Sequence, residues 1–220
     1  MHKVWLVVGF TAVACLAFSL TSVWVYAYWA TSVVKIILFL GIPAVYFFAY
    51  PKQSMKPMFR ANGKKPLLVS AAVGLGVLVF IIVGFILLRN FFDMDGIIAK
   101  LATNNITKAT YPFVFIYIVF INAFMEEVLF RGFAFQTVYN YGYKKVAYVV
   151  SALLFSVYHL PVLVTAVGPV MCVVAVVGLF VAGLFFNEVT RRCKNIWGSL
   201  VIHMAANLAI NSIGAFYFFM

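Results

Sequence analysis

Acidic residues are scarce in this sequence, and so are charged residues of any kind. Aspartate and glutamate together number 5 among 220 residues, charged residues make up 10%, and hydrophobic residues make up 66%. A soluble domain has about 45–50% apolar and about 25% charged residues. The composition therefore excludes an ordinary soluble domain, and it predicts one all-α integral membrane domain over residues 1–220.

Cysteines are also few, and they lie far apart. Cys15, Cys172 and Cys193 form no CxxC pair, so the sequence supports neither a disulfide framework nor a zinc–thiolate site. It has no nucleotide-binding glycine motif, no low-complexity tract and no internal repeat. The net charge of +11 would suggest nucleic acid as the partner of a soluble protein. In a membrane protein, basic residues that flank the helices and set their topology explain it, and no nucleic-acid partner is expected.

Long hydrophobic runs are what the sequence does have, and several reach the ~20 residues that cross a hydrocarbon core. They predict a polytopic bundle of about seven transmembrane helices, with Pro161 kinking the end of the fifth. The first run ends in Trp24, Tyr26, Tyr28 and Trp29, an aromatic cluster typical of a membrane interface. The predicted helices cover residues 4–29, 32–50, 67–88, 111–139, 146–167, 170–187 and 196–219. The more polar residues 89–110 predict a connecting loop or a short surface helix.

Basic residues indicate the orientation of these helices. If the N-terminus is cytosolic, the cytosolic segments hold 11 lysines and arginines and the outer segments hold 4, among them Lys35. This excess favours a cytosolic N-terminus and an outer C-terminus. The loop over residues 51–66 is basic and has no acidic residue, as such a cytosolic flank should.

Two of the acidic residues, Glu126 and Glu127, lie side by side late in an apolar run, and Arg131 follows them. A charged residue at the centre of a membrane helix costs roughly 2.5–3.5 kcal/mol. The cluster is therefore either a short cytosolic loop or a functional site. On a helix, Glu127 and Arg131 are neighbours at i and i+4, whereas Glu126 points to another face. The spacing predicts a Glu127–Arg131 ion pair and leaves Glu126 free to face a cavity, where it could act as a general base or acid.

Two histidines also lie within apolar helices, each near a potential partner. His159 shares a helix face with Phe155, and His203 shares one with Asn207, because each pair is four residues apart. The helical rise places Glu126, His159 and His203 at overlapping depths in the membrane. We therefore expect Glu126, both histidines and Asn207 to converge on one buried site.

These side chains fit peptide hydrolysis. Glu126 with His159 could activate water, and His203 with Asn207 could hold the tetrahedral oxyanion. Alternatively, Glu126, His159 and His203 are the ligand set of a catalytic zinc ion with an open fourth position. No HExxH motif is present, which is the usual spacing of zinc-protease ligands. A divalent metal such as zinc is thus the one cofactor that the sequence leaves open.

Three motifs on separate helices resemble those of the CPBP family of intramembrane proteases. This family includes the type II CAAX prenyl endopeptidases and the bacterial Abi proteins, which are tied to bacteriocin processing and self-immunity. The resemblance covers about residues 111–211, and each of its motif positions is present. The motifs are Glu126-Glu127-x-x-x-Arg131, Phe155-x-x-x-His159 and His203-x-x-x-Asn207.

The resemblance implies roles for the motif residues. Glu126 resembles the catalytic glutamate of the family, and His159 resembles its second catalytic residue. His203 and Asn207 resemble the oxyanion pair. The remaining motif residues, Glu127, Arg131 and Phe155, are expected to support them.

The function that the resemblance implies is an intramembrane endopeptidase, of the metalloprotease or the glutamate type. Its substrate would be a membrane-associated peptide or protein, and it would be located in a bacterial cytoplasmic membrane. Bacteriocin processing, signal-peptide processing and self-immunity are the roles that it suggests. Two alternatives stay open, a non-catalytic membrane partner of a bacteriocin or sensor protein, and a small transporter with a proton relay. The lack of paired inverted repeats argues against the transporter.

Overall fold

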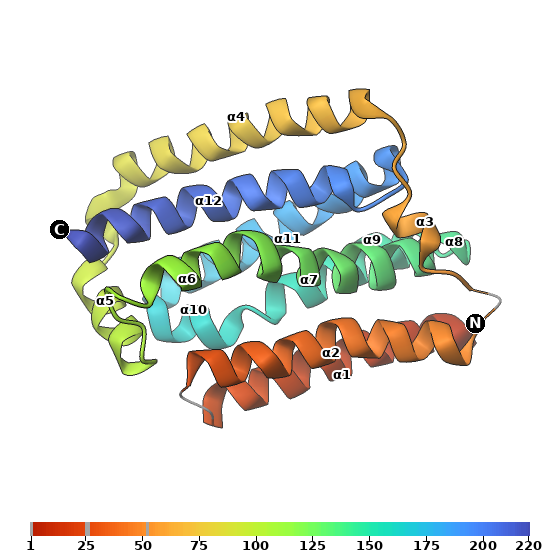
Figure 1. The fold of residues 1–220 in the computed structure, drawn as a ribbon, viewed down its shortest axis with the longest axis horizontal. Coiled ribbons are helices and arrows are strands. Elements are labelled where there is room, and N and C mark those ends of the chain that lie inside the picture. The colour runs from red at the N-terminus through yellow and green to blue at the C-terminus, as the bar shows by residue number, and fades with distance from the viewer. Residues whose placement is uncertain (1, 25–26, 52) are drawn as a thin grey trace.

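A computed structural model describes residues 2–24, 27–51 and 53–220, and these residues form helices and no strand (Figure 1). Seven of the helical stretches within the described residues are long and apolar enough to cross a membrane. Many large apolar side chains on their outer surfaces are exposed, including those of Phe48, Phe80 and Leu87, as expected where a protein meets lipid. The predicted membrane helix bundle is confirmed, and the chain is an integral membrane protein.

The first half of the chain supplies three of these membrane-crossing helices and the segments that join them. In order these are α1 (His2–Trp24), α2 (Tyr28–Ala49), the short α3 (Lys56–Phe59), α4 (Lys64–Leu88), η1 (Arg89–Phe91) and α5 (Met94–Thr103). The 3-10 turn η1 and the short helix α5 occupy the stretch for which the sequence predicted a loop or a short surface helix.

The second half supplies the other four. The stretch from Tyr111 to Asn140 is one span, made of five consecutive helical pieces with different hydrogen bonding. These are α6 (Tyr111–Ile116), η2 (Tyr117–Asn122), α7 (Ala123–Glu126), η3 (Glu127–Thr137) and α8 (Val138–Asn140), followed by α9 (Lys144–Val157), α10 (Leu160–Ala166), α11 (Pro169–Cys193) and α12 (Trp197–Phe219).

The boundary between the first two helices is not where the sequence placed it. The predicted first helix extended to Trp29, but α1 ends at Trp24 and α2 begins at Tyr28; Tyr26 lies outside the described residues. Tyr28 and Trp29 instead pack against the ring of Tyr117, with ring centroids 5.9 Å away in each case. The run is apolar on both sides of the turn, so hydropathy carried no signal for it.

The helix α11 is longer than predicted, because it continues past residue 187 to Cys193. Its last turns are polar, yet Glu188 forms ion pairs of 2.6 Å with both Arg191 and Arg192 on the same helix. Pairs spaced at i,i+3 and i,i+4 stabilise a helix. The charged stretch that the sequence assigned to a connection therefore extends the helix.

The break in the fifth span comes earlier than its proline. The helix α9 ends at Val157, and Pro161 lies in the first turn of α10. A proline ring clashes with the carbonyl of the residue four positions earlier and lacks an N–H to bond it. For Pro161 that residue is Val157. Pro161 therefore causes the break, as predicted, but the break falls earlier in the chain, at Tyr158 and His159.

The span Tyr111–Asn140 lies at the centre of the bundle. In its apolar stretch 56% of the residues are buried, against 6% in the stretch Lys64–Leu88 of α4. Figure 1 shows it between α12, which α4 covers, and the pair α1 and α2 on the other side. Side chains on this span can therefore meet partners from both halves of the chain.

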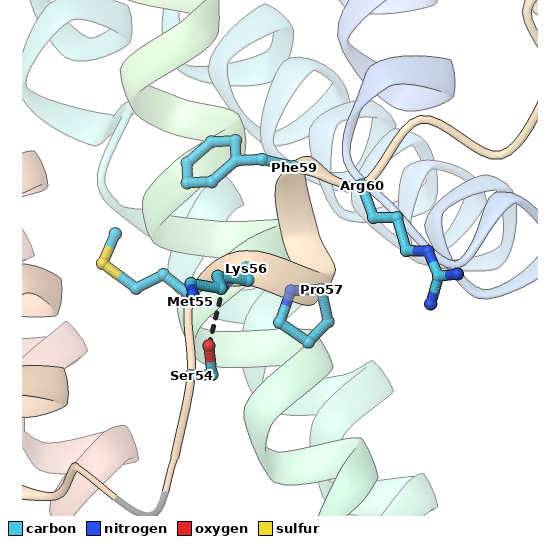
Figure 2. A pocket seen from close by; sticks show the side chains of 6 residues that line it. All are labelled: Ser54, Met55, Lys56, Pro57, Phe59 and Arg60. Carbon is cyan, nitrogen blue, oxygen red and sulfur yellow. Dashed lines mark hydrogen bonds between the residues drawn. The ribbon is translucent and has the colours of Figure 1, made fainter.

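The connection around α3 ties the first half of the chain to the second at one end of the bundle. Met58 is buried against Gly132, where an added Cβ would lie 2.6 Å from the Met58 sulfur. The backbone oxygens of Met58 and Phe59 accept hydrogen bonds of 3.0 Å from the amide of Ile196 and the indole of Trp197. A surface pocket lies along this connection (Figure 2), lined by Ser54, Met55, Lys56, Pro57, Phe59 and Arg60.

Candidate active site

Glu126 lies between two π-helical segments of the central span, η2 and η3. A π-helix bonds residue i to residue i+5, is rare, and is frequent at functional sites. Backbone oxygens in both segments accept bonds from other helices. The Ile118 oxygen accepts from Asn207 Nδ2 at 3.1 Å, and the Phe130 oxygen accepts from Ser151 Oγ at 2.8 Å. The irregular backbone thus fixes α12 and α9 to the span that carries Glu126.

The carboxylate of Glu126 is buried, with 1% of the residue exposed. The sequence predicted a free carboxylate, but the structure pairs it. Lys35 Nζ lies 2.7 Å from its Oε1 in an ion pair. Asn122 Nδ2 donates to the same oxygen at 2.7 Å, and the Tyr158 hydroxyl donates to it as well. Lys35 also donates to Asn122 Oδ1 at 2.5 Å and to the Tyr158 hydroxyl at 3.0 Å. Every donor on this carboxylate among the described residues therefore falls on Oε1.

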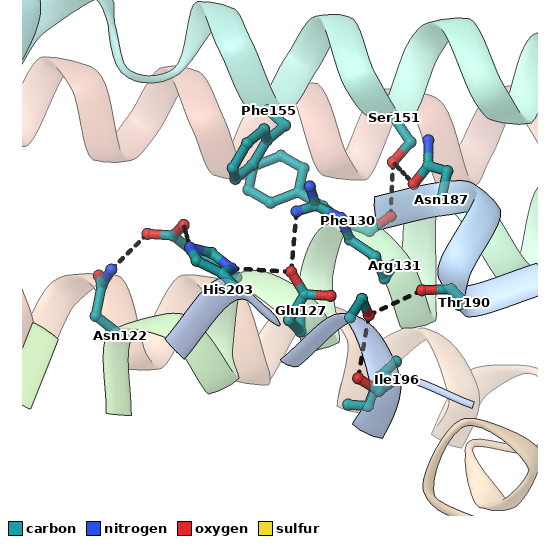
Figure 3. Close-up of polar contacts among 12 residues, drawn as sticks. Asn122, Glu127, Phe130, Arg131, Ser151, Phe155, Asn187, Thr190, Ile196 and His203 are labelled. Atoms are coloured by element: carbon teal, nitrogen blue, oxygen red, sulfur yellow. Dashed lines mark hydrogen bonds and ion pairs between the residues drawn. The ribbon is translucent and has the colours of Figure 1, made fainter. Parts of the chain in front are cut away.

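The other oxygen, Oε2, has a different environment. His203 Nε2 lies 3.5 Å from this oxygen. The opposite ring nitrogen, Nδ1, lies 2.9 Å from Glu127 Oε1 (Figure 3). An ionised carboxylate only accepts hydrogen bonds, so Nδ1 carries a hydrogen. In the neutral tautomer that this contact selects, Nε2 carries a lone pair and faces Glu126 Oε2 as a second acceptor.

The predicted Glu127–Arg131 pair is present, with both side chains fully buried and Arg131 NH1 3.3 Å from Glu127 Oε1. None of the Arg131 side-chain nitrogens has a hydrogen-bond partner among the described residues. The guanidinium carbon instead lies 4.0 Å from the ring centroid of Phe155, 4.8 Å from that of Phe186 and 5.9 Å from that of Phe130. A cation over aromatic faces is stabilised by up to about 2 kcal/mol when desolvated. Phe155 thus supports the motif through Arg131 (Figure 3).

His159 lies in the turn between α9 and α10. Its Nδ1 is 2.7 Å from the Phe155 backbone oxygen, which only accepts, so Nδ1 carries the hydrogen and Nε2 is free to accept. The ring packs on that of Tyr158 with centroids 4.1 Å apart, and it lies within electrostatic reach of Glu126. His159 is half-buried, so it borders the site from a less tightly packed side.

Asn207 is a predicted site residue that lies apart from the carboxylate and the two histidines. Its amide donates to the Ile118 backbone oxygen and, in the described part of the chain, makes no hydrogen bond to Glu126 or to either histidine. One of its two N–H groups is engaged there, and the other remains for a ligand. The structure thus places Glu126, Glu127 and His203 in contact, with His159 beside them and Asn207 at the edge.

A comparison with protein-family models matches residues 108–209 to the family described as Type II CAAX prenyl endopeptidase Rce1-like. Residues 108–209, a little less than half of the 220 residues, are thus similar to this family. The match confirms the family resemblance that the three motifs predicted, and it includes all four of the predicted catalytic residues. The family is a protease family, which supports a hydrolase. Comparisons with curated proteins and with solved structures find no match.

Glu126 is buried, and neither of the two pockets described in the structure reaches it. The two pockets described in the structure lie along residues 54–60, and along residues 61–67 with 193–198. Glu126 lines neither of them, and its side chain is 2% exposed. In this conformation the site is closed, and water has to reach Oε2 through a local opening.

The three ligands proposed for zinc do not fit a metal ion in this arrangement. A cation bound by Glu126 would meet the ammonium of Lys35, which already lies 2.7 Å from Oε1. Within the residues that the structure describes, no group of three His, Cys, Asp or Glu side chains could hold a metal ion. The charge that a metal would bring to Glu126 is supplied by a lysine.

Lys35, Asn122 and Tyr158 are site residues that the sequence analysis missed. Lys35 was assigned to the outer flank, although it lies seven residues inside α2, roughly 10 Å from the start of that helix. That depth was a signal, because a lysine inside a membrane span needs a partner. Asn122 precedes Glu126 by four residues and so shares its helix face. Tyr158 adjoins His159, but its direction depends on the helix break.

Proposed function

We propose that this chain is an intramembrane endopeptidase that hydrolyses a peptide bond in a membrane-associated peptide or protein. The observation that carries the proposal is the 3.5 Å approach of Glu126 Oε2 and His203 Nε2. With the His203 ring neutral, a water molecule beside both atoms would donate one hydrogen to each of them. Its oxygen would then keep its lone pairs for attack on a carbonyl carbon, which is the task of a general base.

In the proposed step Glu126 carries one proton from the water to the leaving nitrogen. The water oxygen bonds to the substrate carbonyl carbon while Glu126 Oε2 takes a proton from it, and the carbonyl oxygen becomes an oxyanion. The same carboxyl then gives that proton to the leaving nitrogen as the C–N bond breaks. Asn207 has an N–H left to donate to the oxyanion, a contact of the kind that contributes about 10²–10³ in rate. In this scheme His203 acts with the base, whereas the family resemblance implied an oxyanion role.

His159 fits a role beside the base. Its Nδ1 hydrogen is fixed on the Phe155 oxygen, so its Nε2 can accept a hydrogen from the water or from the leaving amine. Both His159 and Asn207 are half-buried, whereas Glu126 and His203 are buried. We therefore propose that substrate approaches the carboxylate from the side of His159 and Asn207.

A non-catalytic membrane partner is the second candidate function. The observation that favours it is the closed site, since Glu126 is buried and Lys35 occupies one of its oxygens. A protein that only binds a bacteriocin or a sensor would need no access to Oε2. Roles in bacteriocin processing, signal-peptide processing or self-immunity, in a bacterial cytoplasmic membrane, belong to the proposal and differ in the substrate that they require.

A cleavage assay separates the two candidates. Purified protein in lipid nanodiscs is incubated with a library of membrane-anchored peptides, prenylated and unprenylated, and the products are identified by mass spectrometry. We expect cleavage by the unchanged protein, none by Glu126→Gln, and normal cleavage by Glu188→Gln. Glu188 is the matched control, because it is an ion-paired glutamate on a surface turn of α11.

Loss of activity in Glu126→Gln has to be separated from loss of fold. The amide would leave the buried ammonium of Lys35 without its counter-charge, and breaking a buried pair costs about 3–5 kcal/mol. The double variant Lys35→Met/Glu126→Gln removes both charges and should regain thermal stability while staying inactive. Cleavage by the folded double variant would refute Glu126 as the base.

Chelation tests the metal-free form of the proposal. We expect cleavage to survive exhaustive treatment with a chelator, because Lys35 supplies the positive charge beside Glu126. Loss of cleavage that zinc restores would show instead that the site opens and binds metal.

We further propose that the N-terminus is cytosolic, together with the connection around α3. A cysteine at Lys56 should then react with a membrane-impermeant maleimide only after the cells are opened. The native cysteines Cys15, Cys172 and Cys193 are buried and give little background. Strong labelling in intact cells would reverse the orientation.

A further inference from the structure

We propose that Lys35 is a positioning residue of the active site, which holds Glu126 Oε1 so that Oε2 alone serves as the base. This inference rests on the proposed function. It concerns a residue outside the Rce1-like match, which begins at residue 108, so α2 would complete a site whose other groups lie in the second half of the chain.

The ammonium of Lys35 is fully engaged at the site. Its three hydrogens find three acceptors, Glu126 Oε1 at 2.7 Å, Asn122 Oδ1 at 2.5 Å and the Tyr158 hydroxyl at 3.0 Å. Lys35 as a whole is 6% exposed. An ammonium group has three donors and no acceptor, so this geometry leaves no donor over for substrate. Lys35 therefore acts through Glu126.

Aromatic rings enclose the same ammonium. Nζ lies 5.1 Å from the ring centroids of Phe18 and Phe39 and 4.9 Å from that of Tyr158. Rings from α1, α2 and the turn after α9 thus surround it, and each can stabilise a cation. The surroundings fix the ammonium in place and shield it from water, which strengthens its interaction with the carboxylate.

The charges of the site balance in pairs. Arg131 pairs with Glu127, and Lys35 pairs with Glu126. If Lys35 were absent, a proton on Glu126 or on His203 would be the remaining way to balance the second carboxylate inside the membrane. Either proton would occupy one of the two acceptors that the water requires. Lys35 therefore keeps Glu126 Oε2 and His203 Nε2 free at the same time.

The pH dependence of the proposed base, Glu126, depends on the charged and titratable groups around it. The charged or titratable groups that face or surround Glu126 come from five of the packed segments, and Lys35 is its ion-pair cation. The others are Cys15 of α1, Tyr28 of α2, Tyr117, Glu127 and Arg131 of the central span, Tyr158 and His159 of the turn after α9, and His203 of α12.

The test compares Lys35→Met and Lys35→Arg with Lys145→Met, which changes an exposed lysine at the start of α9. In the nanodisc cleavage assay we expect Lys35→Met to lower kcat by about 10- to 100-fold, part of the roughly 10²–10⁴-fold that a positioned base provides. KM should stay within about 2-fold, because Lys35 does not touch substrate. Lys35→Arg, which keeps a cation, should recover much of kcat, and Lys145→Met should match the unchanged protein.

The pH–rate profile gives the readout that a merely structural role would not move. Without the ammonium, Glu126 takes up a proton more readily, so the acid limb of the profile should shift to higher pH in Lys35→Met. The limb should stay in place in Lys35→Arg. An unchanged kcat and an unchanged acid limb in folded Lys35→Met would overturn the inference, while the proposed function would stand.

A stability cycle tests the pairing without any substrate. Thermal unfolding in nanodiscs is followed for Lys35→Met, Glu126→Gln and the double variant. We expect the double variant to unfold at a higher temperature than either single variant, because it contains no unpaired buried charge. Additive losses would show that Lys35 and Glu126 do not act as a pair, which would overturn the inference even if Lys35→Met proved too unstable to assay. Failure of the proposed function would look different, since the unchanged protein would then cleave nothing.

Discussion

The two adjacent glutamates of this protein are neutralised in opposite ways. Glu127 pairs with Arg131 four residues along the same span, and its cation has aromatic rings around it but no hydrogen-bond partner among the described residues. Glu126 pairs with Lys35 from a helix 91 residues away, and its cation uses all of its hydrogens. One pair is closed within a span, and the other joins the two halves of the chain.

The difference explains which carboxylate can take part in chemistry. Glu127 Oε1 receives both Arg131 and His203, and its Oε2 is fully buried with no partner in the described part of the chain. In Glu126 the hydrogen bonds from the described residues all fall on Oε1, while Oε2 lies 3.5 Å from His203 Nε2. His203 bridges the two carboxylates, because its Nδ1 lies 2.9 Å from Glu127 Oε1 and its Nε2 lies 3.5 Å from Glu126 Oε2. The first pair therefore fixes the histidine, and the second holds the carboxylate that we propose as the base.

The largest effect is expected from breaking the pair within the span. Arg131→Met leaves the fully buried carboxylate of Glu127 without its cation, and we expect a loss of about 3–5 kcal/mol in the free energy of unfolding. Activity should fall with the amount of folded protein. Thermal unfolding in nanodiscs and the yield of monodisperse protein measure it.

Matched variants distinguish the roles of the two cations. Arg131→Lys should also destabilise, because a lysine has no planar group to stack on Phe155, whereas Lys35→Arg should be tolerated. The double variant Glu127→Gln/Arg131→Met should recover part of the stability. If Arg131→Met unfolds normally but does not cleave, Arg131 belongs to the chemistry and the contrast between the pairs is wrong.

A smaller effect is expected from loosening the aromatic cage of Arg131 without touching a charge. Gly183 on α11 packs against α9, where an added Cβ would lie 2.9 Å from the Ala152 Cα. Phe155 and Phe186 follow these residues by three positions on the two helices, so Gly183→Ala should push apart two walls of the cage. Overpacking of this kind costs about 1–3 kcal/mol.

The control for this variant lies on the same helix. An added Cβ at Gly178 would have no neighbour within 4 Å, so Gly178→Ala should leave the unfolding temperature unchanged or raise it slightly. Because the change concerns the Arg131 side of the site, Gly183→Ala should lower stability while the acid limb of the pH–rate profile stays in place. A shifted limb would show that the two pairs are coupled through His203.

The sequence predicted the features of this protein that depend on short spacings. Hydropathy over about twenty residues indicated seven spans, and a separation of four residues indicated the Glu127–Arg131 pair. The order of the motifs indicated the family, and the matched depths of Glu126 and His203 indicated that these two side chains meet.

The features that it missed depend on long-range contacts and on irregular backbone. The sequence offered no rule by which Lys35 on one helix selects Glu126 on another. Regular helical geometry could not foresee the π-helical segments that turn the Ile118 oxygen toward Asn207. Tyr158 reaches Glu126 because α9 breaks at Val157, four residues before Pro161. The prediction of a kink at Pro161 did not include this change in the direction of Tyr158.

The smallest effect is expected at Tyr158, whose hydroxyl donates to Glu126 Oε1 and accepts from Lys35. Tyr158→Phe keeps the ring between Phe39 and Phe130, with centroids now 5.6 and 5.2 Å away. A hydrogen bond to a charged group contributes about 1.5–3 kcal/mol. Lys35 and Asn122 remain on Oε1, so we expect the low end, near 1.5 kcal/mol.

In kinetic terms that energy corresponds to a loss of about tenfold in kcat, since roughly 1.36 kcal/mol is tenfold in rate. The acid limb should not move, because the cation stays in place. Tyr148→Phe is the control, since its hydroxyl donates to Glu188, away from the site, and should leave kcat unchanged. If Tyr158→Phe lost as much activity as Lys35→Met, the tyrosine would act on the reacting atoms directly, and Lys35 would hold the tyrosine as much as the carboxylate.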